Sequence, residues 1–206
     1  MLSADALRQV VKDCAGDTFT GRLYRAVQLQ YLPTLTSTEG AWKAPNRYTA
    51  AEVSHALYVA MAPDLAMLEA TRQFQRNFDT PTFPAYCILP ADVDLRRILD
   101  LTRDAHQDAL GTSIEELSGD WRAAHSRQLQ HPERRVVTHD LGRAAKDAGF
   151  EGLKYFSAYD AARWNIVIFT ENLTEERQVI FDLPPAAIEA ASTLKKPRKE
   201  RTKRGR

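Results

Sequence analysis

Segments with the alternating pattern of β-strands lie near both ends of this 206-residue chain, and segments with helical spacing lie mostly between them. A strand is predicted at 21–27, and two more are predicted at 152–158 and 164–170. No long succession of strand–helix–strand units runs along the chain, so a doubly wound parallel sheet is not expected. This order predicts an α+β fold with a central sheet flanked by helices.

The clearest local prediction is a short strand followed closely by a helix. The strand is ALYVA at 56–60. The helix begins at Pro63 and Asp64, where a proline is tolerated and a carboxylate favours the helix dipole. Another strand is predicted at 85–89, whereas periodicity does not decide between strand and helix for the apolar run 93–102.

Capping residues and spacing predict the remaining elements. Ser3 is expected to cap a helix over 3–14, and Gly149 is expected to end a helix that begins at Asp140. A loop is predicted at 34–46, where Gly40 interrupts any regular pattern. Further helices are predicted at 114–117, 121–130 and within 181–194.

The net charge of +1 conceals an uneven distribution. Residues 195–206 contain eight Lys and Arg and one Glu, a charge of +7, so residues 1–194 carry −6. We therefore predict one folded domain over 1–194 and a disordered basic tail at 195–206. The tail is open to three interpretations: a nucleic-acid contact, a contact with an acidic partner, or a solvated terminus.

Several classes of protein and site are not expected. No apolar run approaches the roughly 18 residues of a membrane span, and the charged N-terminus is not typical of a signal peptide, so a cytoplasmic protein without membrane association is expected. Cys14 and Cys87 lie far apart, and the five histidines show no metal-binding spacing, so no metal is predicted. The phosphate-binding motifs GxxxxGK[ST] and GxGxxG are both absent, so any nucleotide is bound by other means.

Three residues around the 56–60 strand suggest chemistry. Arg47 lies in the preceding loop, Tyr58 within the strand, and Glu69 on the second turn of the following helix. A cation, an aromatic ring and a carboxylate on rigid elements could grip the phosphates of a dinucleotide, stack on a base and stabilise a sugar cation. The ordinary alternatives are a surface arginine, a core tyrosine and a glutamate paired with Arg72.

Six motifs, taken in order, resemble the RES domain family and together cover roughly residues 20–175. They are LYR at 23–25, NRY at 46–48, ALYVA at 56–60, APDLAMLE at 62–69, GFEGLKYFSA at 149–158 and WNIVIF at 164–169. The resemblance implies a single ADP-ribosyltransferase-like domain with a central split β-sheet. It also implies a toxin of a toxin–antitoxin pair that acts on NAD, with an antitoxin that covers the pocket and carries a helix-turn-helix DNA-binding domain.

The resemblance also implies roles for single residues. Glu69, Arg47 and Tyr58 match the catalytic glutamate, arginine and strand tyrosine, and Ser157 matches the late serine. Arg47, Tyr58 and Ser157 are then expected to bind NAD. Arg25 is a secondary candidate, because an arginine in a partly buried strand requires a partner, either a carboxylate such as Glu69 or a phosphate.

The chemistry at the nicotinamide–ribose bond gives Glu69 a role on physical grounds. Cleavage passes through an oxocarbenium-like state, which a preorganised carboxylate stabilises. The sequence leaves the acceptor of the ADP-ribose open, so hydrolysis, phosphorolysis and mono-ADP-ribosyl transfer to a protein or nucleic acid are alternatives. From another class, the chain could be a non-enzymatic nucleic-acid-binding module that uses its basic tail.

Overall fold

The computed structural model describes residues 2–35, 37–78, 82–175 and 178–183. The predicted basic tail and most of the helix predicted within 181–194 lie outside the described residues.

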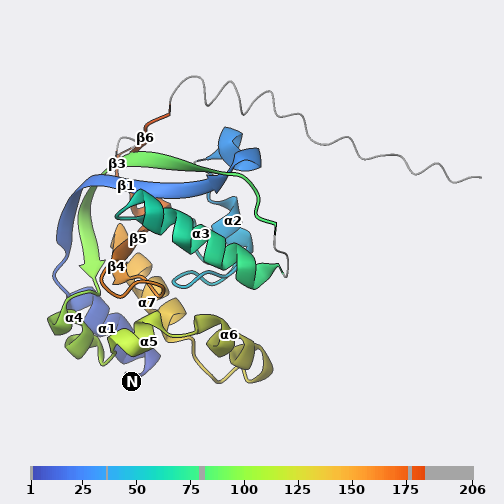
Figure 1. The fold of residues 1–206 in the computed structure, drawn as a ribbon. Coiled ribbons are helices and arrows are strands. Elements are labelled where there is room, and N and C mark those ends of the chain that lie inside the picture. The colour runs from blue at the N-terminus through green and yellow to red at the C-terminus, as the bar shows by residue number, and fades with distance from the viewer. Residues whose placement is uncertain (1, 36, 79–81, 176–177, 184–206) are drawn as a thin grey trace, which may run out of the picture.

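The described strands form one sheet in the order β1-β2-β5-β4-β3-β6, and β1 also pairs with β3. Only the β3–β4 pair is parallel. Because β1 pairs with both β2 and β3, the sheet curves back on itself, and Figure 1 shows β1 and β3 as two long, bent neighbours. The strands are β1 (Asp17–Gln28), β2 (Ala56–Ala60), β3 (Tyr86–Asp100), β4 (Gly152–Phe156), β5 (Trp164–Phe169) and β6 (Val179–Phe181).

The apolar run whose type the sequence left open belongs to β3. Ala91, Val93 and Leu95 are buried, while the acidic residues Asp92 and Asp94 between them face solvent. This alternation is the pattern of a strand with one buried face. β3 pairs antiparallel with almost the whole of β1, so long-range pairing decides the conformation of this run.

The helices lie in two groups (Figure 1). α3 runs along the sheet beside β1 and β2, whereas α1, α4, α5 and α7 gather near the N-terminus. None of the described helices is long and apolar enough to cross a membrane. The helices are α1 (Ala4–Asp13), α2 (Glu39–Lys43), α3 (Pro63–Asn77), α4 (Asp104–Leu110), α5 (Ile114–Ser118), α6 (Trp121–Gln130) and α7 (Val137–Asp147), with 3₁₀ turns η1 (Leu29–Thr34) and η2 (Thr170–Asn172).

Two predictions of helix boundaries were wrong. The predicted loop at 34–46 contains α2, whose Trp42 ring stacks on His55 at 4.5 Å. α7 begins at Val137, three residues before the predicted start. Asp140 lies in the first turn and accepts a hydrogen bond from Arg135 Nε at 2.6 Å, so its carboxylate serves an ion pair where a cap was predicted.

The mixed α+β class with a central sheet is confirmed, and the alternation in β2 separates two apolar layers. Leu57 and Val59 pack with Ile166 on one face of the sheet. Tyr58, from the opposite face, packs in the layer that contains Tyr155. The second face is the one that carries the candidate site.

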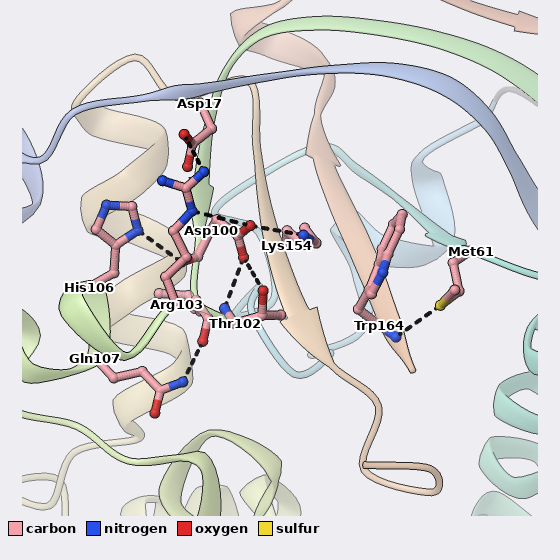
Figure 2. Close-up of polar contacts among 10 residues, drawn as sticks. Asp17, Met61, Asp100, Thr102, Arg103, His106, Gln107, Lys154 and Trp164 are labelled. Atoms are coloured by element: carbon pink, nitrogen blue, oxygen red, sulfur yellow. Dashed lines mark hydrogen bonds and ion pairs between the residues drawn. The ribbon is translucent and has the colours of Figure 1, made fainter. Parts of the chain in front are cut away.

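A polar network fixes the end of β3 (Figure 2). Asp100 is only 5% exposed, and its carboxylate accepts hydrogen bonds from the Thr102 backbone N–H and from Lys154 Nζ, both at 2.9 Å. Arg103 bridges this carboxylate to Asp17. Lys154 also lies over the Trp164 ring. Burial alone would raise the pKa of Asp100, but its hydrogen bonds to Thr102 and Lys154 lower it overall.

We expect Lys154→Met to reduce the free energy of unfolding at neutral pH by about 1–2 kcal/mol, because it leaves a buried carboxylate with fewer partners. The lowered pKa of Asp100 means that its charge stabilises the fold above the ordinary value of about 3.9 and stops doing so as pH falls through the folded-state pKa. The difference in the free energy of unfolding between wild type and variant should therefore become smaller in acid. Urea unfolding at several pH values measures it, and Lys43→Met, which removes an exposed pair with Glu39, is the control expected to change little.

Candidate active site

A cavity of about 640 Å³ lies beside the sheet face that carries Tyr58 and Tyr155. Its walls come from β1, β2, β4 and β5, from α2 and the loop after it, and from α3 and α6. A volume of this size is typical of a site for a small molecule or cofactor. Arg47, Tyr58 and Glu69 all line it, so the structure brings the three residues together.

Glu69 is held in a fixed orientation by two neutral donors. Its Oε1 accepts hydrogen bonds from Ser157 Oγ at 2.7 Å and from Asn165 Nδ2 at 2.8 Å. Leu65 is fully buried under α3, so the helix presents its next turn, with Glu69, to the sheet. The alternative pairing with Arg72 is not formed among the described residues. The carboxylate is therefore preorganised in the cavity wall.

Ser157 lies behind the cavity wall and contacts Glu69. It is 1% exposed, and its Oγ accepts a hydrogen bond from the Tyr159 backbone N–H at 3.1 Å while donating to Glu69. In this structure the hydroxyl is thus engaged with the glutamate and the turn after β4. The sequence hypothesis had assigned it a direct contact with a ligand.

Arg47 is anchored at one nitrogen and leaves the others available. Its Nη1 donates to the carbonyl oxygens of Leu117 and Gly119, both at 2.8 Å. These carbonyls belong to the end of α5, so a segment 70 residues away in the chain positions the guanidinium. Nε and Nη2 make no hydrogen bond to the described residues, and they offer donors suited to a phosphate.

The loop that carries Arg47 is held against α7. His139 Nε2 donates to the Asn46 carbonyl at 2.9 Å, and burial lowers the pKa of His139 to about 4, so the imidazole is neutral at neutral pH. Gly142 lets the loop approach closely, since a Cβ there would lie 1.8 Å from the Tyr48 carbonyl oxygen.

We expect Gly142→Ala to reduce the free energy of unfolding by about 2 kcal/mol through overpacking, although alanine normally favours a helix. The displaced loop should also lower any activity that depends on Arg47. Chemical denaturation measures the stability change. Gly40→Ala in α2 is the matched control, because a Cβ there would meet nothing within 4 Å and should be neutral or stabilising. Equal effects at the two glycines would contradict this account of the loop.

Tyr58 contributes its ring to the cavity and its hydroxyl to the loop. The hydroxyl accepts a hydrogen bond from the Tyr48 backbone N–H at 3.2 Å and pairs with Thr49 Oγ1 at 3.0 Å. Burial raises the pKa of Tyr58 to about 12, so the phenol stays protonated. Tyr58 lines the cavity, and its hydroxyl connects β2 to the segment that carries Arg47, whereas stacking of its ring on a ligand stays a prediction.

Arg25 also lines the cavity, but the ion pair considered for it is not formed in the described structure. Its Nη1 donates to the Leu35 carbonyl at 2.9 Å, and the Glu69 oxygen is occupied by its two neutral donors. Burial lowers the pKa of Arg25 to about 10, so the guanidinium stays charged at neutral pH. A half-buried, charged side chain without an acidic partner is suited to an anionic ligand.

Sequence reasoning missed two residues beside Glu69. Asn165 is 3% exposed and is the single polar residue of the apolar strand WNIVIF, a signal that could have marked it, since a buried amide needs partners. Tyr155 lines the cavity nearby, and burial together with the charge of Glu69 raises its pKa. Two further cavity residues on α6, Arg122 and His125, carried no local signal.

The described residues contain no group of three His, Cys, Asp or Glu side chains close enough to hold a metal ion. Both cysteines are free. The absence of a metal cofactor stays a prediction.

Comparison with known proteins places the chain in a family. No curated protein matches the sequence. Among solved structures, a chain of the M. tuberculosis MbcT-MbcA toxin-antitoxin complex has the same fold, with a TM-score of 0.69 and 21% sequence identity over 91% of this chain and 97% of that one. The family model of the RES domain matches residues 22–187. The chain therefore belongs to the RES domain family.

Proposed function

We propose that this protein is an enzyme that cleaves the nicotinamide–ribose bond of NAD and acts as the toxin of a toxin–antitoxin pair. The observation that carries the proposal is a carboxylate, Glu69, which two neutral donors fix in the cavity. The same cavity holds two arginines, Arg25 and Arg47, for which the described residues provide no acidic partner. NAD is proposed as the substrate from the family resemblance, and a carboxylate beside two arginines is compatible with cleavage of this dinucleotide.

The proposed step begins with NAD bound so that the ribose C1′ faces Glu69. The bond between C1′ and the pyridine nitrogen breaks, and its electron pair leaves with nicotinamide, which becomes neutral. Positive charge develops on C1′ and the ring oxygen, and the carboxylate stabilises it. The acceptor then forms the new bond to C1′, and its proton is lost to solvent or to a nearby base.

The arginines are proposed to bind the pyrophosphate. The free Nε and Nη2 groups of Arg47 can form a bidentate contact, and Arg25 can contact the same group from β1. The Tyr58 ring is proposed to stack on the nicotinamide or the ribose. Rigid anchoring of each side chain favours catalysis, because little reorganisation accompanies charge development.

The biological setting is proposed from the family and from the structural neighbour, which was crystallised as a toxin-antitoxin complex. A cognate antitoxin that covers the cavity and binds DNA through a helix-turn-helix domain is the expected partner. Induced expression of the free chain should arrest growth, and co-expression of its antitoxin should restore it.

NAD labelled in the adenosine half tests the reaction and identifies the acceptor. Purified protein should release nicotinamide. Labelled ADP-ribose would identify water as the acceptor, its phosphorylated form would identify phosphate, and label on macromolecules would identify a transferase. Failure to release nicotinamide under all these conditions would contradict the proposed reaction.

A further inference from the structure

Three arginines gather at the end of the cavity that contains Tyr159, and the proposed reaction uses only one of them. Arg47 and Arg122 line the cavity together with Tyr159, and the Arg76 guanidinium lies over the Tyr159 ring, 5.2 Å from its centre. They come from the loop before β2, from α6 and from α3. We refer to Arg47, Arg76 and Arg122 as the arginine cluster.

Within the described parts of the chain, no member of the arginine cluster forms an ion pair with a carboxylate. Arg47 donates to two carbonyl oxygens, and Arg122 lies over the Trp121 ring at 4.7 Å. The nearby Asp120 carboxylate caps α6 through backbone N–H groups. Burial is the main reason that the pKa of Arg122 is lowered; Arg76 and Arg47 also lower it, whereas Tyr159 and Asp120 raise it. Like charges held together without counterions are typical of a site for a polyanion.

Arg47 connects the cluster to the reacting end of the cavity. It lies within electrostatic range of Tyr155, which in turn feels the charge of Glu69, and within range of Arg122. A dinucleotide whose ribose C1′ lies at Glu69 and whose pyrophosphate lies at Arg47 therefore extends its adenosine half toward α6.

The charge of the cavity exceeds that of NAD. Three guanidinium groups line the cavity, those of Arg25, Arg47 and Arg122, and the exposed Arg76 lies beside it over Tyr159. Glu69 is the carboxylate that opposes them, which leaves three positive charges on these groups. In NAD the pyridinium cation offsets part of the pyrophosphate charge. A 2′-phosphate on the adenosine ribose adds about −1.5 to −2 at neutral pH and brings the complex closest to balance.

We infer that Arg76 and Arg122 bind a phosphate group on the adenosine ribose, so that the enzyme prefers the 2′-phosphorylated dinucleotide NADP to NAD. The inference rests on the proposed reaction for the orientation of the substrate. Arginines beside the ribose 2′ position are a general means of accepting a 2′-phosphate, and planar guanidinium groups match its geometry.

The test measures binding separately from turnover. In Glu69→Gln protein, calorimetry should show NADP binding about tenfold or more tightly than NAD. In the same Glu69→Gln background, a second substitution, Arg122→Gln or Arg76→Gln, should reduce this preference to less than about threefold, chiefly by weakening the binding of NADP. Arg72→Gln is the matched control, because this α3 arginine is exposed and, among the described residues, hydrogen-bonds only with Gln75. The preference should survive this substitution.

The second part of the test measures turnover of the two dinucleotides. Wild-type protein should have a kcat/KM for nicotinamide release that favours NADP by about tenfold, and Arg122→Gln should abolish the preference. Equal binding of the two dinucleotides, or equal losses for both in Arg122→Gln, would overturn the inference. So would inorganic phosphate that binds the NAD complex through Arg122 while NADP shows no advantage, because the ligand would then be free phosphate. Absence of turnover with both dinucleotides contradicts the proposed reaction, whereas tighter binding of NADP still supports the arginine cluster as a 2′-phosphate site.

Discussion

Glu69→Gln should reduce kcat for nicotinamide release by about 10²–10³-fold, equivalent to about 3–4 kcal/mol of transition-state stabilisation. The carbonyl oxygen of the glutamine can still accept the hydrogen bonds from Ser157 and Asn165 that Glu69 Oε1 accepts. The substitution therefore removes the negative charge and keeps the geometry. Because the loss concerns charge that develops only in the transition state, KM should change little.

Two controls separate chemistry from folding. The thermal midpoint of Glu69→Gln should stay close to that of the wild type, since the packing and hydrogen bonds of the site persist. Glu133→Gln, at an exposed position before α7, should have wild-type activity. A Glu69→Gln enzyme that keeps more than about a third of the wild-type kcat would exclude electrostatic stabilisation by this carboxylate.

Sequence patterns within one segment correctly predicted the elements whose conformation that segment determines by itself. The strand at 56–60 and the helix after Pro63 were confirmed because alternation, an initial proline and an early acidic residue determine them within one segment. α2 was missed because it has only five residues and contains Gly40, and Trp42 stacking on His55 holds it. The sequence did not decide the conformation of β3 beyond residue 89, because this part of the strand is fixed by its pairing with β1, a distant part of the chain.

The candidate site divides in the same way. Arg47, Tyr58 and Glu69 lie within one short stretch of sequence, so their spacing and the family motifs brought them to attention. Asn165, which fixes Glu69, is 96 residues from it in the chain, and no single-sequence pattern reports that contact. The position of Arg122 likewise depends on where α6 lies beside the cavity, which no local pattern determines.

Asn165→Asp should be almost as damaging as the loss of Glu69, because it places a second carboxylate against the first. The wild-type amide presents its Nδ2 to Glu69 Oε1 at 2.8 Å in a position that is 3% exposed. Two carboxylates at that distance cannot both ionise readily, so the pair retains a proton and the pKa of one member rises. With its charge partly neutralised by the shared proton, Glu69 should stabilise the transition state poorly, and kcat should fall by about 10²-fold.

The stability of Asn165→Asp should depend on pH in a characteristic direction. A carboxyl group whose pKa is higher in the folded than in the unfolded protein binds protons preferentially when folded, so stability rises as pH falls toward the unfolded value of about 4. Asn165→Leu removes the amide without adding charge, and it should lower kcat by only about tenfold and show no such pH dependence. Urea unfolding across this range, beside nicotinamide release at neutral pH, compares the two variants. If Asn165→Asp and Asn165→Leu behave alike in both measurements, Asn165 does no more than fill space. A difference in the expected direction shows that its amide keeps Glu69 ionised and aligned for the sugar cation.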